Sequence, residues 1–400
     1  MRRKGRRNSA SSESADQLVH REVDSLILLA LTLLVGCTAA KEKKLGCEDP
    51  PQAPEDLPPF ELTVSKSGSQ MMGNHVLLNQ NNGPLSWATT IDACGNHVWW
   101  EPVDNPDNRI YRAKLALDGD SLLIAEKDRD GLVDTAWARR ITPEGKELSR
   151  TRTIEAHHDL VEIDDGSLAW ISHQYADNIW FVGLEEDIVS DVIRTAEEGD
   201  ETESDERIFS LFDDSDVETW WVCEHMGPSQ RVPGFAEWSH SNSLMWEPKD
   251  EALYLLIRYW DSVVKLDRKG QVDWYLGGPL NDFEIIADTV LPSHGHMSEV
   301  WPGGMLVFDN RNHTPLASRV VEYAIDEEAM TVEEVWSAEE PDGQLVNFLG
   351  DARRLPNGNA LVSWSTSGRI TEYDRKGKIV WEARNENTIG RIQWISDWPG

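Results

Sequence analysis

The stretch "HSNSLMWEPKDEALYLLIRYWDSVVKLDRKGQVDWYLGG", residues 240–278, contains the pattern that decides the fold. Its runs of β-branched, aliphatic and aromatic residues, such as "ALYLLI" and "SVVKLD", are separated by polar turn sequences such as "DRKGQ". This alternation predicts a meander of short antiparallel strands. After the N-terminal residues 1–36, no long segment repeats apolar residues at helical spacing, so the sequence predicts an all-β protein.

Similar units recur about every 45 residues, which is the period of propeller blades. They begin near Gly73, Tyr111, His157, His240, His296 and Gly350. Four units end on a strand with a tryptophan, as in "GNHVWWE" and "GKIVWEA", and the chain has 18 Trp in all. A tryptophan at one fixed place in each unit indicates packing between blades. We therefore predict a six-bladed β-propeller around a central channel, with seven or eight blades as alternatives.

The N-terminal segment resembles a bacterial lipoprotein leader. A basic start is followed by the apolar run "SLILLALTLLVGC", which ends at Cys37 and is too short to span a bilayer. We predict a signal peptide over residues 1–36, a lipidated Cys37, a proline-rich tether over 37–60 and the propeller over 61–400. The predicted location is the periplasmic side of the cell envelope, with the membrane contacted only through the lipid anchor. An ordinary secretory signal or a short anchor is the alternative.

Charge and cysteine content restrict the partners. The formal net charge is −33, and removal of residues 1–36 would leave 32 Lys and Arg against 67 Asp and Glu, a charge of −35. Such acidity argues against a nucleic-acid partner. An export compartment permits disulfides, and if one forms, Cys94 with Cys223 is the expected pair because Cys47 lies in the tether. The oligomeric state is left open.

Three histidines lie at matched places in the repeat. His158 precedes Gly166 by eight residues, His296 precedes Gly304 by the same distance, and His240 has a turn two residues longer. The innermost strands of a propeller line its channel, so these imidazoles are expected to converge there. Converging histidines can act as nucleophile, acid or base, or bind an anion.

Other side chains extend this candidate site. Arg258 and Asn242 could donate hydrogen bonds to an anionic group. Three imidazoles would also suit zinc, but no carboxylate–histidine spacing supports that alternative. Separately, "EKDRDGLVD" spaces Glu126, Asp128, Asp130 and Asp134 in the manner of a structural calcium loop, with a charged hairpin as the more ordinary interpretation.

The stretch 238–326 resembles the bacterial aryl-sulfate sulfotransferase family, and a weaker resemblance extends over about residues 70–390. The similar features are the His-x-Asn at 240–242, the arginine at 258, and the histidine at 296 followed by the strand "GMLVFDN". The resemblance implies a periplasmic six-bladed propeller that transfers sulfuryl groups from phenolic sulfate esters to phenols and requires no cofactor. It assigns His240, Asn242, Arg258 and His296 to the site.

The implied mechanism passes through a sulfohistidine, with neighbouring histidine and arginine donors on the sulfuryl oxygens. In the family the nucleophilic histidine follows the Phe-Asp-Asn strand, and this chain has no histidine beyond His313. Either His296 or His313 is then the nucleophile, with His158 as a further site residue, or the channel binds sulfate without transferring it.

Two other functions compete with the transferase. The ending "DRKGKIVWEA" is similar to the blades of quinone-dehydrogenase-type lipoproteins, so a non-catalytic propeller that binds an envelope partner is the main alternative. A quinone-cofactor dehydrogenase is a third hypothesis, and it would require a bound chromophore. Transfer of a sulfuryl group from an aryl sulfate donor would distinguish the transferase from both the binding propeller and the dehydrogenase.

Overall fold

The computed structural model describes residues 50–129, 134–181, 184–204, 206–215, 223, 229 and 234–400. These residues form six sheets and one short 3-10 helix, η1 (Ser365–Ser367), and none of them belongs to an α-helix. Their strands pair antiparallel except for the short outer strands β13 (Ala236–Glu237) and β18 (Glu284–Ile285), which pair in parallel with their neighbours. In this part of the chain no helix is long and apolar enough to cross a membrane. The signal peptide and Cys37 lie outside the described residues, so those assignments stay predictions.

Each sheet is one blade, and its strands follow from the channel outward. Blade 1 contains β27 (Thr388–Ile395), β2 (His75–Asn82), β3 (Leu85–Asp92) and β4 (His97–Pro102). Blade 2 contains β5 (Asn108–Leu115), β6 (Leu122–Asp128), β7 (Trp137–Ile141) and β8 (Glu147–Arg152). Blade 3 contains β9 (Ala156–Glu162), β10 (Ser167–Phe181), β11 (Leu184–Glu197) and β12 (Arg207–Ser210), and β13 (Ala236–Glu237) pairs with β11.

The other three blades have the same plan. Blade 4 contains β14 (Ser241–Glu247), β15 (Ala252–Ile257), β16 (Ser262–Asp267) and β17 (Val272–Gly277). Blade 5 contains β19 (Gly295–Trp301), β20 (Gly304–Asp309), β21 (Arg319–Asp326), β22 (Thr331–Glu339) and an outer β18 (Glu284–Ile285). Blade 6 contains β23 (Asp351–Arg354), β24 (Ala360–Ser363), β25 (Arg369–Tyr373), β26 (Ile379–Arg384) and an outer β1 (Glu61–Ser65).

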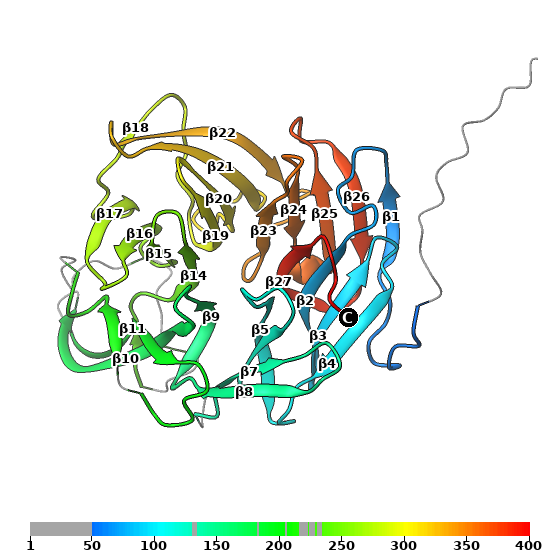
Figure 1. Cartoon of the computed structure of the whole chain (residues 1–400). Coiled ribbons are helices and arrows are strands. Elements are labelled where there is room, and N and C mark those ends of the chain that lie inside the picture. The colour runs from blue at the N-terminus through cyan, green and yellow to red at the C-terminus, as the bar shows by residue number, and fades with distance from the viewer. Residues whose placement is uncertain are drawn as a thin grey trace, which may run out of the picture. The chain divides into compact units, whose positions relative to one another are not determined.

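The inner strands form a closed ring, since each of β5, β9, β14, β19, β23 and β27 contacts the next and β27 contacts β5. Figure 1 shows the six sheets around this common centre. The prediction of an all-β six-bladed propeller is confirmed. One detail was wrong: the unit expected to start near Gly73 has its inner strand at the other end of the chain, in β27.

Burial between blades explains the continuous apolar runs of the sequence. Every residue of β15 is buried. Its alternate side chains Leu253, Leu255 and Ile257 pack with blade 3, while Tyr254 and Leu256 pack with blade 5. Successive residues of a strand point to opposite faces of the sheet, so a strand that is covered on both faces needs apolar residues at every position.

The tryptophans expected between blades lie there. Trp274 on β17 packs into the core shared with blade 5, and Trp381 on β26 packs into the core shared with blade 1. Trp99 on β4 and Trp336 on β22 pack in the same way against the blades that follow them. The repeated aromatic position is therefore structural, as predicted from the sequence.

Candidate functional site

The channel histidines, which we define as His158, His240 and His296, come together as the spacing predicted. The ring centroid of His158 lies 4.9 Å from that of His240 and 6.1 Å from that of His296. The three side chains come from blades 3, 4 and 5 and meet where their inner strands begin. A cluster of imidazoles therefore lies at one end of the channel.

Bulges at the start of two inner strands aim His296 and the neighbouring Asn242. The pairing of β14 with β15 skips Asn242, and the pairing of β19 with β20 skips His296. A bulge turns a side chain out of the regular alternation and is common beside functional sites. The register also shows that His296 corresponds to Asn242 in blade 4, while His240 corresponds to His294. The prediction that His240 and His296 are equivalent was off by two residues, although both reach the same cluster.

His296 is held in one tautomer. Its Nδ1 lies 3.0 Å from the carbonyl oxygen of Gly350, and a carbonyl only accepts, so Nδ1 carries the proton. The Nε2 lone pair is then left for chemistry. Burial, together with the positive charge of Arg391, holds the pKa of His296 well below its usual range. The ring is therefore neutral at physiological pH, as a nucleophile must be.

His158 is oriented by a chain of two further buried groups that the sequence did not reveal. The Nδ1 atoms of His157 and His158 lie 2.7 Å apart, and His157 Nε2 lies 3.1 Å from Asp191 Oδ1. Asp191 and His157 are almost fully buried. A carboxylate behind a histidine fixes its tautomer and stabilises its protonated form. The arrangement suits a proton-transfer role for His158.

Polar donors surround the channel histidines. Asn242 donates through Nδ2 to the carbonyl of Gly295 at 2.9 Å, and no described residue bonds its buried Oδ1. Arg391 on β27 donates to the Asn242 carbonyl through Nη2, while its buried Nη1 has no partner among the described residues. The buried Nε of Arg258 likewise has none in the described part of the chain. Unpaired buried donors are costly, and an anion in the channel would satisfy them.

A belt of ion pairs supports these donors deeper in the channel. Arg112 Nε lies 3.1 Å from Asp159 Oδ1, and Arg353 Nη2 lies 3.1 Å from Asp351 Oδ2. A cavity of about 420 Å³ continues along the channel and is lined by every inner strand. Its lining includes Arg112, Asp159, Leu244, Ser298, Arg353 and Gln393.

A second group, the loop cluster, consists of Cys223, Asp261, His294 and His313. Cys223 Sγ lies 3.0 Å from His294 Nε2 and 3.5 Å from His313 Nε2, and His313 Nε2 lies 3.5 Å from Asp261 Oδ2. His313 was predicted as a catalytic residue, and its described contacts are in this cluster. Tyr259 links the two groups, with its ring 5.2 Å from that of His240 and 5.5 Å from that of His294.

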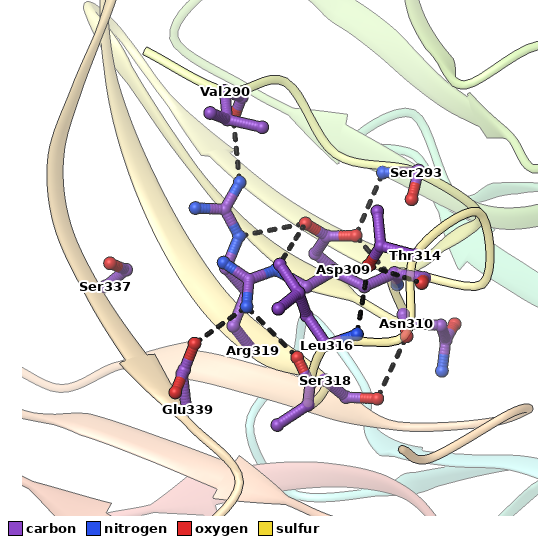
Figure 2. Close-up of polar contacts among 12 residues, drawn as sticks. Val290, Ser293, Asp309, Asn310, Thr314, Leu316, Ser318, Arg319, Ser337 and Glu339 are labelled. Atoms are coloured by element: carbon purple, nitrogen blue, oxygen red, sulfur yellow. Dashed lines mark hydrogen bonds and ion pairs between the residues drawn. The ribbon is translucent and has the colours of Figure 1, made fainter. Parts of the chain in front are cut away.

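The "FDN" motif positions two loops of the loop cluster, those that carry His294 and His313. Asp309 accepts hydrogen bonds from the backbone N–H of Ser293 at 2.9 Å and of Arg311 at 3.0 Å, and from Arg319 Nε at 2.9 Å. Figure 2 shows this network around Asp309. Ser293 precedes His294, and Arg311 leads to His313. The motif thus has a structural role that its spacing alone did not indicate.

The predicted calcium residues take part in ion pairs. Glu126 Oε1 accepts from Arg139 at 2.7 and 3.0 Å, and Asp134 Oδ2 accepts from Arg152 at 2.8 Å. Asp128 is described and ends β6, whereas Asp130 lies outside the described residues. Calcium binding at this hairpin stays a prediction.

The expected disulfide is wrong. Cys94 is in a disulfide, but Cys223 carries a buried thiol beside His294. Cys94 and Cys223 are therefore not paired with each other. Sequence position could not show that Cys223 lies beside histidines of blade 5.

The fold and the site define a class: a six-bladed propeller whose channel holds converging histidines and arginines. A family model described as Arylsulfotransferase (ASST) matches residues 61–389. The chain belongs to the arylsulfotransferase family. No curated protein matches it.

Three solved structures illustrate the similarity of this chain to known proteins, each at low identity. A Bacteroides caccae protein of unknown function is 14% identical, with a TM-score of 0.48, and the match covers 81% of this chain and 99% of that one. The periplasmic gluconolactonase of Pseudomonas aeruginosa is 12% identical, with a TM-score of 0.44 and coverage of 80% and 99%. A putative 6-phosphogluconolactonase of Bacteroides fragilis is 12% identical, with a TM-score of 0.43 and coverage of 82% and 100%. Nothing about function follows from these likenesses.

Proposed function

We propose that the protein transfers a sulfuryl group from an aryl sulfate to a phenol, with His296 as the nucleophile. The observation that carries this proposal is the hydrogen bond from His296 Nδ1 to the Gly350 carbonyl, which leaves Nε2 as the basic nitrogen. Family membership supports the substrate class. Of the two nucleophiles that the sequence left open, His296 is favoured because it lies among the channel histidines.

In the first step Nε2 of His296 attacks the sulfur of the ester. The N–S bond forms while the S–O bond to the aryl group breaks, and the departing phenolate takes a proton from His158 or His240. In the second step the acceptor phenol gives its proton back to that histidine and its oxygen attacks sulfur, which releases His296. No nucleotide or redox partner is needed for this exchange.

The arginines stabilise the charge of the transferring group. Three sulfuryl oxygens need several donors, and Arg391 and Arg258 both offer buried nitrogens near His296 that no described residue bonds. Preorganised donors of this kind contribute most where water is excluded. The Asp191–His157 pair would hold His158 ready to donate its proton.

The test is sulfuryl transfer by the purified protein from p-nitrophenyl sulfate to phenol, compared with the variant His296→Asn. The asparagine amide can still donate to the Gly350 carbonyl in place of Nδ1, but it has no atom at Nε2. We expect activity to fall at least about a thousandfold. His75→Gln is the matched control, because His75 begins β2 in blade 1 and lies outside both clusters. Full activity in His296→Asn, or no transfer by the parent protein across a panel of aryl sulfates, would refute the proposal.

We also propose that the protein is held in the envelope by a lipid on Cys37, on the periplasmic side. The disulfide at Cys94 supports an oxidising compartment. Metabolic labelling with a fatty acid should mark the parent chain and not Cys37→Ser; equal labelling of both would contradict the anchor.

A further inference from the structure

We propose that the loop cluster of Cys223, His294, His313 and Asp261 is a zinc site. The ligand atoms of Cys223, His294 and His313 all lie within 4.8 Å of one another. A thiolate, two imidazoles and a carboxylate are the donors that zinc takes in proteins. The proposal does not depend on sulfuryl transfer, and its experiment does not measure it.

Three separations between ligand atoms are close to those around a tetrahedral ion, whereas Asp261 does not lie within 4.8 Å of all three other ligand atoms and would turn inward as the fourth ligand. Zn–S bonds of about 2.3 Å and Zn–N bonds of about 2.0 Å place neighbouring ligand atoms about 3.5 Å apart. The distance from Cys223 Sγ to His313 Nε2 is 3.5 Å, and so is the distance from His313 Nε2 to Asp261 Oδ2. The distance from Cys223 Sγ to His294 Nε2 is 3.0 Å, so this edge would lengthen slightly on binding.

Three of the ligands, Asp261, His294 and His313, lie on separate loops whose backbones are held by hydrogen bonds. Asp261 ends the turn between β15 and β16, and its Oδ1 accepts the backbone N–H of His294 at 2.6 Å. His294 and Asp261 both hold a positive φ, +54° and +50°. The Asp309 network fixes the loops before His294 and before His313. A site assembled on rigid segments loses little entropy when the ion binds.

Charge also favours a divalent ion. Cys223 would bind as a thiolate and release one proton, and Asp261 would bind as a carboxylate, so the two anions balance the charge of Zn²⁺. His294 is fully buried and Cys223 nearly so, which protects the thiolate from solvent. His313 and Asp261 are more exposed, with side-chain exposures of 23% and 32%, and they provide the open side through which the ion enters.

One contact must change when the ion binds. Arg258 Nη2 lies 3.3 Å from His294 Nδ1 and 3.4 Å from the Asn347 carbonyl. With zinc on Nε2, the His294 proton moves to Nδ1, which can no longer accept from arginine. Arg258 would then donate to Asn347 alone.

A second cluster with metal-ligand residues is a different arrangement. His157, His173 and Asp191 also lie within 4.8 Å of one another. However, the rings of His157 and His173 are stacked at 4.1 Å, and both nitrogens of His157 already face His158 and Asp191. That cluster serves the channel histidines, so one metal site is expected.

The test is Co²⁺ binding by the full chain after treatment with a chelator, followed by competition with Zn²⁺. We expect one equivalent of Co²⁺ to give a thiolate-to-cobalt charge-transfer band and the intense visible bands of tetrahedral cobalt, both abolished by Zn²⁺. Cys223→Ser should remove the charge-transfer band. His313→Gln should weaken Co²⁺ binding by more than about tenfold, since removal of a group that only hydrogen-bonds to a metal ligand already costs that much.

The control is His75→Gln, which removes an imidazole elsewhere and should leave the spectrum and the stoichiometry unchanged. Thermal unfolding of the parent should shift upward with added Zn²⁺, and that of Cys223→Ser should shift much less. Failure of the parent to take up Co²⁺, or a charge-transfer band that persists in Cys223→Ser, would overturn the proposal.

Discussion

Substitution of Asp309 by asparagine should destabilise the fifth blade measurably. Asp309 is 1% exposed, and its Oδ2 lies 2.9 Å from Nε of Arg319, whose side chain is 3% exposed. Asparagine keeps the size of the side chain and an oxygen for the N–H groups of Ser293 and Arg311. It places an amide or an uncharged oxygen against a buried guanidinium, which then keeps Glu334, the Val290 carbonyl and the Tyr323 hydroxyl as acceptors.

The magnitude follows from this burial. Arg319 keeps Glu334 as an ion-pair partner, so the loss is that of one buried hydrogen bond to a charged group, about 2–3 kcal/mol. A folded unit of about 340 residues has an unfolding entropy near 0.7 kcal/mol/K, so Tm should fall by about 3–4 °C. Because the same carboxylate fixes the loops of His294 and His313, the Co²⁺ affinity of the loop cluster should fall as well.

The assay is reversible thermal or urea unfolding followed by tryptophan fluorescence. The matched control is Asp164→Asn, which breaks a surface pair with Arg268 whose side chains are 47% and 45% exposed. Exposed pairs contribute about 0–1 kcal/mol, so this variant should barely change Tm. The double variant Asp309→Asn/Arg319→Met should be more stable than the sum of its two single losses. A Tm change below about 1 °C in Asp309→Asn, or strict additivity, would refute the reasoning.

Three other variants test separate parts of the molecule. Gly350→Ala should lower the free energy of unfolding by about 2–5 kcal/mol in urea titrations, because its φ is +108° and an added Cβ would lie 2.2 Å from Phe308; a neutral result would contradict this. Asp191→Asn should lower kcat of transfer by about tenfold or more and alter its pH profile, since His157 loses its carboxylate; unchanged kinetics would exclude this positioning role. Lys114→Met should raise the free energy of unfolding at pH 7 by about 1–3 kcal/mol, because burial lowers the Lys114 pKa to about 8. In the parent, the free energy of unfolding should rise between pH 8 and about 10.5, because in this range Lys114 is protonated in the unfolded chain and deprotonated in the folded one. This rise should be missing in the variant.

The repeat made much of the fold predictable. Glycine turns and final tryptophans fixed the blades, and the offset between a histidine and its glycine turn indicated that His158 and His296 line the channel. These features are local in sequence, so they can be read along the chain. Convergence then follows from ring closure alone.

Contacts between blades, and between strands that are not neighbours in a sheet, could not be predicted in this way. The approach of Cys223 to His294 depends on how loops of different blades meet. Asp191 on β11 and His157 on β9 belong to the same blade but are separated by β10, and no spacing in the sequence records their contact. Arg391 was missed because its strand closes the first blade from the other end of the chain. The incorrect pairing of Cys94 with Cys223 has the same cause.

The ring is closed by strands from both ends of the chain, and this has a consequence for how the protein folds. The N-terminal strand β1 pairs with β26 and completes blade 6, and the C-terminal strand β27 pairs with β2 and completes blade 1. β27 is made after the other five inner strands and brings Arg391 to the channel. A chain whose synthesis stops before residue 388 would therefore lack both the seal of the ring and an arginine of the site. Closure of the ring and delivery of Arg391 to the channel therefore depend on the same last strand.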